Sequence, residues 1–325
     1  MKIGITYDLR SEYLKMGFSE DETAEFDQEG TIEAIETTLN ELDFKTIRIG
    51  HIKQLVSRLS KGDRWDLVFN IAEGMYGNGR EAQVPALLDA YQIPYVFSSP
   101  LVLTLTLDKG LTKRVIRDAG IATPDFSVIN TLSEIDKIKL DFPLFAKPVA
   151  EGTGKGINAS SVIHNKEELE EKCRSLLTEY HQAVLVERFL PGREFTVGVV
   201  GTGMNACAVG TIEIVLMENA EKNVYSYVNK EQCETLIEYK LAFGKEKMLC
   251  EAVGLQAYRL LGCEDGGRVD IRMDEYGIPN FLEINPLAGL HPEHSDLPIL
   301  SRLNGISYRE LMKMIMDSAI KKIGT

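Results

Sequence analysis

The chain has 325 residues, more than one ordinary hydrophobic core holds, so we expect roughly two or three domains. Its formal net charge of −13 argues against DNA or RNA as a partner, although a local cationic pocket for a nucleotide is compatible with that charge. The composition, 44% hydrophobic and 26% charged, is that of a globular protein. The five cysteines lack CxxC spacing, and no signal peptide or membrane-length apolar run is visible. We therefore expect a soluble, cytoplasmic protein with reduced cysteines and no membrane contact.

Strands and helices alternate over the first hundred residues. We expect strands over Met1–Tyr7, Phe44–Ile49, Trp65–Ile71 and Ile93–Phe97, and helices over Thr31–Leu42 and Ala82–Tyr91. This alternation predicts a small open α/β domain. The turn after the first strand lacks G-x-G-x-x-G, which disfavours a dinucleotide site. The acidic stretch from Ser11 to Asp27 predicts a long loop, either functional or disordered.

The segment after the third of these strands carries charge where open α/β sheets bind ligands. Residues 72–80 read Ala-Glu-Gly-Met-Tyr-Gly-Asn-Gly-Arg. Because loops at the carboxyl ends of strands hold ligands in such sheets, Glu73 and Arg80 are candidates for a substrate site. A solvated turn explains either residue alone equally well.

Two lysine-bearing segments follow. Residues 108–119 predict a basic amphipathic helix, for which a solvated face is the simplest interpretation. Phe142–Pro148 predicts a strand with Lys147 inside an apolar run, and burying that lysine is costly unless an anion pairs with it. The next segment, residues 151–156, has glycines at every second position, which permits close backbone approach to a ligand and an anion nest. It is not a Walker A loop, and a mobile tip without function is the alternative.

The remaining elements are mostly strands and helices of ordinary length. We expect strands over Val184–Val186, Phe195–Gly201 and Cys207–Glu213, and helices over Glu246–Leu261 and Tyr308–Ile320.

Between those two helices lies the most regular pattern of the chain. Two alternating runs, Arg268–Met273 and Asn280–Asn285, flank the turn signal Asp-Glu-Tyr-Gly and predict a β-hairpin. We expect the turn to be centred between Tyr276 and Gly277.

That centre makes Asp270 face Glu283 and Arg268 face Asn285. Two opposed carboxylates repel unless a positive charge lies between them, and Mg²⁺ held together with phosphates is a common solution. The opposite face is expected to be buried, through Val269, Ile271, Leu282 and Ile284. A surface hairpin whose polar residues face water is the alternative.

Several of these stretches resemble one family when taken together. FPLFAKP-x-x-EGTGKG, VLVERFLPGREF, GGRVDIRM and FLEIN, in this order and at these distances, resemble the ATP-grasp fold, and more narrowly D-alanine–D-alanine ligase and its relatives. The resemblance extends from about Trp65 to the C-terminus. It implies an α/β and α+β protein with three parts: an N-terminal open α/β substrate domain (1–104), a central subdomain with the Gly-rich loop (105–187) and a C-terminal subdomain with the metal-binding hairpin (188–325).

The resemblance also implies roles, position by position. The residues implied to bind ATP are Lys109, Lys147, Gly152, Thr153, Gly154, Lys155, Gly156, Glu187, Phe189, Leu190, Glu194 and Lys230. The implied metal ligands are Asp270, Glu283 and Asn285, as the hairpin register indicates independently, for two Mg²⁺ ions with Mn²⁺ as an alternative. The implied catalytic residues are Arg268 beside the acyl phosphate, Lys230 of a lid, and Thr153 where the loop usually has Ser.

The reaction implied is the joining of two small molecules. A carboxylate attacks the γ-phosphorus of ATP to form an acyl phosphate, and an amine then displaces phosphate. The partners expected are therefore a small carboxylate and a small amine, within a homodimer as in the family.

The substrate end departs from the family pattern. The N-terminal Gly-Gly-x-Ser-x-Glu motif is missing, and Glu73-Gly74, Glu231 and Ser295-Asp296 replace the usual His-Gly, Tyr and Ser-Leu. The residues expected at the substrates are Glu73, Arg80, Tyr227, Gly289 and Ser295. Added carboxylates favour a cationic or amine-bearing substrate, unless each pairs with a local arginine such as Arg80.

We therefore expect an ATP- and Mg²⁺-dependent carboxylate–amine ligase whose substrates are not two D-alanines. Three alternatives stay open at this point: authentic D-alanine–D-alanine ligase of cell-wall synthesis, a related enzyme that activates another group, and a non-catalytic ATP-binding protein. Erosion of the metal ligands or Arg268 would favour the last, yet all four residues are present.

Overall fold

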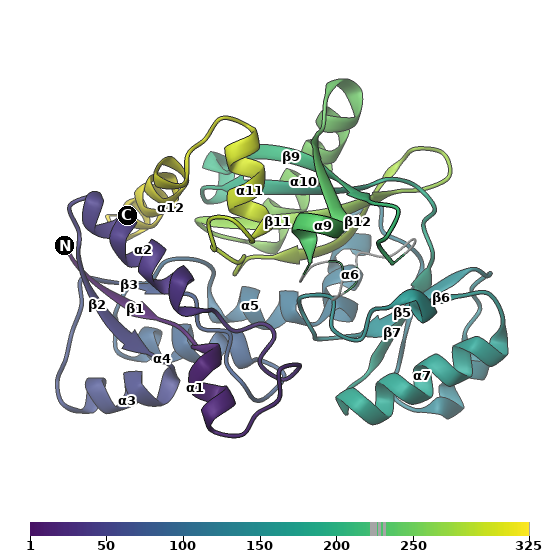
Figure 1. Ribbon diagram of the computed structural model, residues 1–325, viewed down its shortest axis with the longest axis horizontal. Coiled ribbons are helices and arrows are strands. Elements are labelled where there is room, and N and C mark those ends of the chain that lie inside the picture. Colours follow the sequence, from purple (N-terminus) through teal and green to yellow (C-terminus); the bar gives the residue numbers. More distant parts are fainter. Residues whose placement is uncertain (222–225, 227–228, 230–231, 325) are drawn as a thin grey trace.

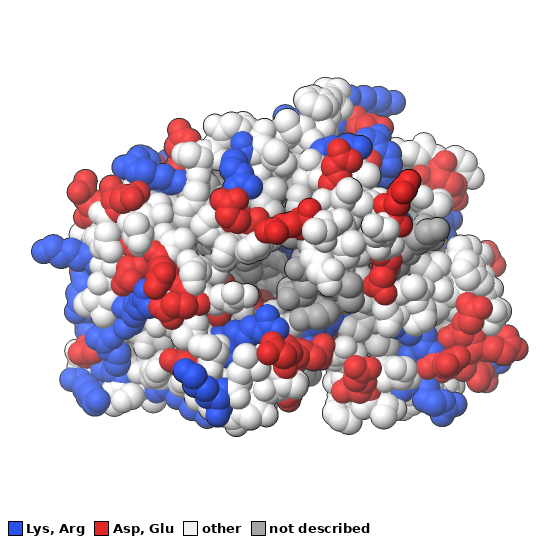
Figure 2. Space-filling model, in the orientation of Figure 1, with Lys and Arg blue, Asp and Glu red and all other residues white. Residues whose placement is uncertain are grey.

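The computed structural model describes residues 1–221, 226, 229 and 232–324, and within that part of the chain the strands form three sheets (Figure 1). This confirms the mixed α/β and α+β architecture expected from the sequence. None of the helices in the described part is long and apolar enough to cross a bilayer. Figure 2 shows Asp and Glu side chains interspersed with Lys and Arg side chains, so the negative net charge is not gathered in one patch on this face.

The N-terminal sheet is parallel, with the strand order β2-β1-β3. Its strands and helices are β1 (Lys2–Thr6), α1 (Arg10–Lys15), α2 (Glu29–Glu41), β2 (Lys45–Gly50), α3 (Ile52–Ser60), β3 (Leu67–Asn70) and α4 (Gln83–Ala90), with a 3-10 turn η1 (Arg80–Ala82) before α4. Alternate residues of β3 face opposite sides: Phe69 packs with α2, whereas Val68 packs with α3 and α4. Helices on both faces explain why all of β3 is buried.

Two predictions for this region are wrong. Ile93–Phe97 is not a strand, because only Tyr95 forms a bridge, to Val68. Phe97 leaves the sheet with a left-handed φ of 76°, and its N–H donates to the carboxylate of Asp265 instead. The stretch from Ser11 to Asp27 is not all loop, since α1 extends into it as far as Lys15.

Three α-helices and an antiparallel sheet form the central part (Figure 1). The elements are α5 (Pro100–Leu107), α6 (Lys109–Asp118), β4 (Phe126–Ile129), η2 (Leu132–Lys137), β5 (Leu144–Pro148), η3 (Ala159–Ser161), β6 (Val162–Ile163), α7 (Lys166–Tyr180) and β7 (Val184–Arg188), with the sheet order β4-β7-β5-β6. Helix α6 begins where the Asp108 carboxylate accepts the Leu111 N–H, an N-cap that fixes the start of the helix at Lys109.

The C-terminal sheet is antiparallel, with the order β10-β9-β8-β11-β12. Its elements are β8 (Glu194–Val200), η4 (Gly203–Asn205), β9 (Cys207–Leu216), α9 (Cys233–Leu236), β10 (Ile237–Leu241), α10 (Gly244–Leu261), β11 (Gly266–Met273), β12 (Pro279–Asn285), α11 (Asp296–Leu303) and α12 (Tyr308–Ile323). Helix α10 ends at Gly262, whose φ of 74° is the left-handed conformation that commonly closes helices.

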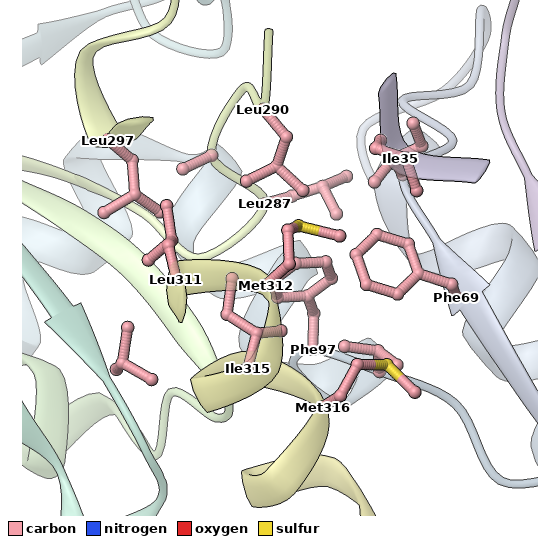
Figure 3. Close-up of a cluster of buried hydrophobic side chains, with 14 of the residues drawn as sticks. Ile35, Phe69, Phe97, Leu287, Leu290, Leu297, Leu311, Met312, Ile315 and Met316 are labelled. Carbon is pink, nitrogen blue, oxygen red and sulfur yellow. The ribbon is translucent and has the colours of Figure 1, made fainter. Parts of the chain in front are cut away.

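One hydrophobic cluster joins the two ends of the chain. Met312 and Met316 of α12 pack with Phe69 and Phe97 of the N-terminal part, as Figure 3 shows. Leu287, from the segment after β12, belongs to the same cluster. The loop that follows β12 is therefore anchored on a core shared by the first and last parts of the chain.

Truncating a side chain in this cluster should destabilise the whole protein. Met312 is 0% exposed, and Met312→Ala should lower the free energy of unfolding by about 2–5 kcal/mol, measured by chemical denaturation. Met204 is 85% exposed, so Met204→Ala is the matched control and should change little. Equal losses in the two variants would show that α12 does not tie the N-terminal part to the fold.

Candidate active site

The predicted hairpin is formed by β11 and β12, and its predicted register is confirmed where the polar residues lie. Asp270 pairs with Glu283, and Arg268 pairs with Asn285. The two carboxylates therefore stand on neighbouring strands of one sheet, facing the central sheet across a cavity.

A β-bulge follows these pairs. The register shifts after Asp270, because Ile271 pairs with Phe281 and leaves Leu282 as an extra residue. The prediction that Leu282 lies on the buried face is wrong: Phe281, at 0% exposed, takes that position, and Leu282 lines the cavity. The bulge thus turns two successive side chains, Leu282 and Glu283, toward the same space.

The first cavity lies between the central and C-terminal sheets. Its walls come from β5 and β7 on one side and from β11 and β12 on the other. The residues implied to bind ATP that line it are Lys109, Lys147, Gly154, Lys155, Glu187, Phe189, Leu190 and Glu194. The structure therefore brings together residues that are spread over four elements and two loops of the sequence.

A network of buried ion pairs forms the floor of this cavity. Glu187 lies 2.7 Å from the ammonium of Lys113 and 3.7 Å from that of Lys147. Glu283 lies 3.1 Å from Lys147 and 3.9 Å from Lys109. Burial alone would raise the pKa of Glu187, but the ammonium groups of Lys113 and Lys147 outweigh it and hold that pKa below its usual range.

The same network shifts the lysines in opposite directions. Burial outweighs Glu187 and lowers the pKa of Lys113, whereas Glu283 and Glu187 together outweigh burial and raise the pKa of Lys147. Lys147 is therefore held as a cation inside the cavity. Its two carboxylate partners are the anions that the sequence requires for a lysine buried in an apolar strand.

Lys113 was not among the predicted site residues. The interpretation of residues 108–119 as a helix with a solvated basic face is wrong for this side chain, which is 0% exposed. One signal was available: Lys109 and Lys113 are four residues apart, so they share a face of α6.

The other end of the first cavity is lined by an aromatic ring and a carboxylate. The guanidinium of Arg272 lies 5.0 Å from the ring centroid of Phe189 and 3.2 Å from Glu194. Glu194 and Phe189 were predicted here from the resemblance, whereas Arg272, which holds both, was not. A flat group between Phe189 and Leu282 and a hydroxyl-bearing group near Glu194 fit this end.

The hairpin residues fit a hard divalent cation by their chemistry. Asp270, Glu283 and Asn285 supply oxygen donors only, which Mg²⁺ prefers. Asp270 accepts from Arg268 at 2.6 Å and from the Thr196 hydroxyl at 2.9 Å, which orients its carboxylate. Over the described ranges, no group of three His, Cys, Asp or Glu side chains is arranged to hold a metal. The donor set at this hairpin would instead be two carboxylates, Asp270 and Glu283, and the amide of Asn285.

The Gly-rich loop adopts backbone conformations that favour glycine. Thr153, Gly154 and Gly156 have φ values of 49°, 75° and 73°. A Cβ on Gly156 would lie 2.6 Å from the Pro148 side chain, so close packing also requires glycine there. The hydroxyl oxygen of Thr153 is buried without a hydrogen-bond partner among the described residues.

The N-terminal acidic segment contacts this loop through Glu25. The Glu25 carboxylate accepts the Gly152 N–H and pairs with Arg80 at 2.7 Å, while Arg80 donates to the carbonyl of Ala150 at 3.0 Å. Sequence reasoning missed Glu25, because 127 positions separate it from Gly152 and no local pattern marks the contact. Arg80 therefore forms its ion pair with Glu25 and not with Glu73.

The second cavity adjoins the first at Lys109 and Glu283 and is strongly acidic. Its lining includes Glu25, Glu73 and Glu81. Within the described residues, neither Glu73 nor Glu81 has a hydrogen-bond or ion-pair partner. Burial, reinforced by Glu81 and Glu25, raises the pKa of Glu73 well above its usual range, and burial raises the pKa of Glu81 to about 7 despite Arg80.

The third cavity shares Thr153, Arg268 and Gly289 with the second. Ser295 also lines it, and the residues outside the prediction that line it include Asp27, His291, His294 and Asp296. Of the predicted residues, Lys230 and Tyr227 lie outside the described part of the chain, as does Glu231. The predicted substrate residues Glu73, Gly289 and Ser295 thus line two neighbouring spaces beside the hairpin, whereas Arg80 lines neither and contacts the second space only through Glu25.

The chain is similar to known proteins over most of its length. The family model for the C-terminal part of D-Ala–D-Ala ligases (D-ala D-ala ligase C-terminus) matches residues 115–317. The D-alanine–D-alanine ligase of Aquifex aeolicus is 30% identical over 292 residues, which are 88% of this chain and 93% of that protein. An uncharacterized protein of Sinorhizobium fredii is 34% identical over 262 residues, which are 79% of this chain and 75% of that protein.

The fold is also that of solved structures. The crystal structure of D-alanine–D-alanine ligase from Bacillus anthracis complexed with ATP matches with a TM-score of 0.74 at 22% identity, covering 99% of this chain and 98% of that chain. This likeness shows the ATP-grasp fold.

Removing the buried cation beside Glu187 should cost stability. Lys113→Met leaves a buried carboxylate without its nearest partner, so the free energy of unfolding at pH 7 should fall by about 3–5 kcal/mol. The control is Lys166→Met, which breaks an exposed pair with Asp136 and should change little. A Lys113→Met protein as stable as its control would contradict the buried network.

Proposed function

Because the chain belongs to the D-alanine–D-alanine ligase family of ATP-grasp proteins and is an ATP-dependent, ADP-forming ligase, we propose that it joins a cationic carboxylate substrate to an amine and does not use two D-alanines. One observation carries the proposal. Glu73 and Glu81 face the second cavity without a cationic partner among the described residues.

Charge compensation argues for the substrate class. Glu25 is already paired with Arg80, so Glu73 and Glu81 are the carboxylates that a ligand must satisfy. The raised pKa values of Glu73 and Glu81 reflect burial without an ion-pair partner, so a bound cation would favour the ionised form of each. D-Alanine brings one ammonium and can pair with one of them, whereas an amino acid with a basic side chain brings two cationic groups and can pair with both.

The remaining residues take the roles that their positions allow. Lys109 and Lys147 would hold phosphates of ATP, and the buried hydroxyl of Thr153 would donate to an anion in the same space. The Gly152–Gly156 loop would cover those phosphates, and Glu194 would bind the ribose. Arg268 would stabilise the negative charge that develops on the carboxyl group as it is phosphorylated.

Asp270, Glu283 and Asn285 would hold Mg²⁺, with a second ion and use of Mn²⁺ as parts of the proposal. When bound, the ion neutralises phosphate charge. Arg268 and Lys147 form ion pairs with the two carboxylates and so orient them for that purpose. The role of Lys230 in a lid belongs to the same proposal.

Authentic D-alanine–D-alanine ligase is the second candidate, favoured by the names of the relatives. The identity of 30% over most of the chain shows the family. Which substrates a member of the family uses depends on the residues that line its substrate site. A non-catalytic ATP-binding protein is disfavoured, since Arg268 and the metal ligands are assembled around the cavities.

The proposal is tested by phosphate release from ATP and Mg²⁺ with amino acids offered singly and in pairs. We expect release with basic amino acids of one chirality as the carboxylate substrate, and loss of release in Asp270→Asn. Release with D-alanine alone at an equal or higher rate would establish the plain D-alanine–D-alanine ligase instead.

The pH dependence should report Glu81. Its pKa of about 7 leaves it neutral below that pH and anionic above it, and only the anion pairs with a cationic substrate. With a basic amino acid, kcat/KM should therefore rise as the pH increases through about 7, and Glu81→Gln should remove that rise. The control is Glu170→Gln, which changes an exposed glutamate of α7 outside these cavities and should keep the rise. A rise of the same size in Glu81→Gln would rule out this carboxylate as its source.

A further inference from the structure

The segment that presents two carboxylates to the second cavity follows strand β3. It spans residues 72–82, and Glu73 and Glu81 stand near its two ends. Gly74 has a φ of 72°, and a Cβ there would lie 2.5 Å from the carbonyl oxygen of Arg80. The two ends of this 72–82 loop are therefore in backbone contact, which brings both glutamates to one space.

Holding Glu73 in this space is unfavourable as long as no cation is bound. Burial, together with the nearby carboxylates of Glu81 and Glu25, raises the pKa of Glu73 well above its usual range. A loop that was free to move would relieve this cost by turning the carboxylate toward water. The fold must therefore hold the loop in place.

Asp8 holds it from the end of the neighbouring strand. Strands β1 and β3 are parallel neighbours (Figure 1) and pair Thr6 with Asn70, so the residues that follow them meet at the same edge of the sheet. Asp8 is 2% exposed, and its carboxylate accepts the Gly74 N–H at 2.8 Å and the Tyr13 hydroxyl at 2.5 Å. One buried carboxylate thus ties the 72–82 loop to the first strand and to α1.

The residue before Glu73 is held in a similar way. The side-chain oxygen of Asn70 accepts the Ala72 N–H at 3.3 Å and the Thr6 hydroxyl at 2.8 Å. Side chains at the ends of β1 and β3 therefore bind the N–H groups on both sides of Glu73. The bond to Asp8 is the shorter of the two and has a carboxylate as acceptor, which makes it the stronger one.

We propose that Asp8 is a positioning residue of the substrate site: through Gly74 it holds Glu73 in the second cavity, and the preference for a basic carboxylate substrate depends on it. This inference rests on the proposed function and deepens it. Asp8 is not among the described residues that line the second cavity, so it acts through Glu73 and not on the substrate itself. A carboxylate fixed in advance pairs with an arriving cation without the cost of ordering the loop.

Lysine and norleucine test the proposal, since they differ only by the terminal amino group. Each enantiomer is offered with ATP, Mg²⁺ and hydroxylamine, a small nucleophile without charge at pH 7 that converts an acyl phosphate to a hydroxamate. The measured quantity is the ratio of kcat/KM for hydroxamate formation, lysine over norleucine. We expect Glu73→Gln to lower this ratio at least about tenfold, because removing one partner of a desolvated charge pair costs at least that much.

Asp8→Ala should lower the same ratio about tenfold and leave KM for ATP within about twofold, because only the carboxylate that meets the cation is displaced. Asp8→Asn should keep the ratio, since its amide oxygen can accept the Gly74 N–H and its amide nitrogen can donate to the Tyr13 hydroxyl oxygen. If Asp8→Ala does not fold, Asp8→Ser takes its place, because the shorter side chain no longer reaches Gly74. An unchanged ratio in the folded variant would overturn the inference.

The same two strands offer a matched control. At their opposite end, the exposed carboxylate of Asp66 accepts the Lys2 N–H at 2.7 Å. Asp66→Ala therefore removes a bond of the same kind between the same segments, away from the cavities, and should leave the ratio unchanged. A fall as large as that of Asp8→Ala would trace the effect to the sheet and overturn the role of Asp8.

A double variant shows whether Asp8 acts through Glu73. If it does, Asp8→Ala combined with Glu73→Gln lowers the ratio no further than Glu73→Gln alone. Effects that multiply would show that Asp8 acts elsewhere and would overturn the inference.

The unaltered protein separates failure of this inference from failure of the proposed function. If it shows no preference for lysine over norleucine, the proposed substrate class falls, and the inference falls with it. If it prefers lysine and Asp8→Ala keeps that preference, the inference alone is overturned and the proposed function stands.

Discussion

Two carboxylates face each other across one hairpin, and the rest of the site depends on how their mutual repulsion is compensated. Asp270 and Glu283 are paired in β11 and β12, where like charges repel. Arg268 bonds to Asp270 from the same strand, whereas Lys147 reaches Glu283 from the central sheet. The central sheet is thus held against the hairpin by charge, and the first cavity is the space between them.

The features that could be predicted from the sequence are those set by nearby residues. The hairpin register follows from period-two alternation and the position of the turn, and the mixed α/β and α+β architecture follows from the order of elements and the family resemblance. The bulge could not be predicted, since Phe281 and Leu282 are both apolar and alternation does not say which one is buried. The contact of Glu25 with Gly152 joins residues 127 positions apart and has no local signature. Phe97 likewise leaves its sheet for a partner 168 positions away.

The two sides of the site differ in how their charges are balanced. Around the first cavity, carboxylates alternate with buried lysines in a network of ion pairs. Around the second cavity, Glu73 and Glu81 have no ion-pair partner among the described residues, and Arg268 is shared by Asp270 and Asp296. A family that keeps one reaction while changing its substrates needs only the substrate-binding residues to differ. The proposed function assigns that part to the second cavity.

The central claim is that this site phosphorylates the carboxyl group of a cationic substrate, and oxygen transfer tests it most directly. A basic amino acid that supports turnover would be labelled with ¹⁸O in its carboxyl group and incubated with ATP, Mg²⁺ and an amine. If the carboxylate attacks ATP, one labelled oxygen moves to the released phosphate in each turnover, and mass spectrometry of the phosphate detects it. Unlabelled phosphate, or no phosphate with any basic amino acid, would contradict the account.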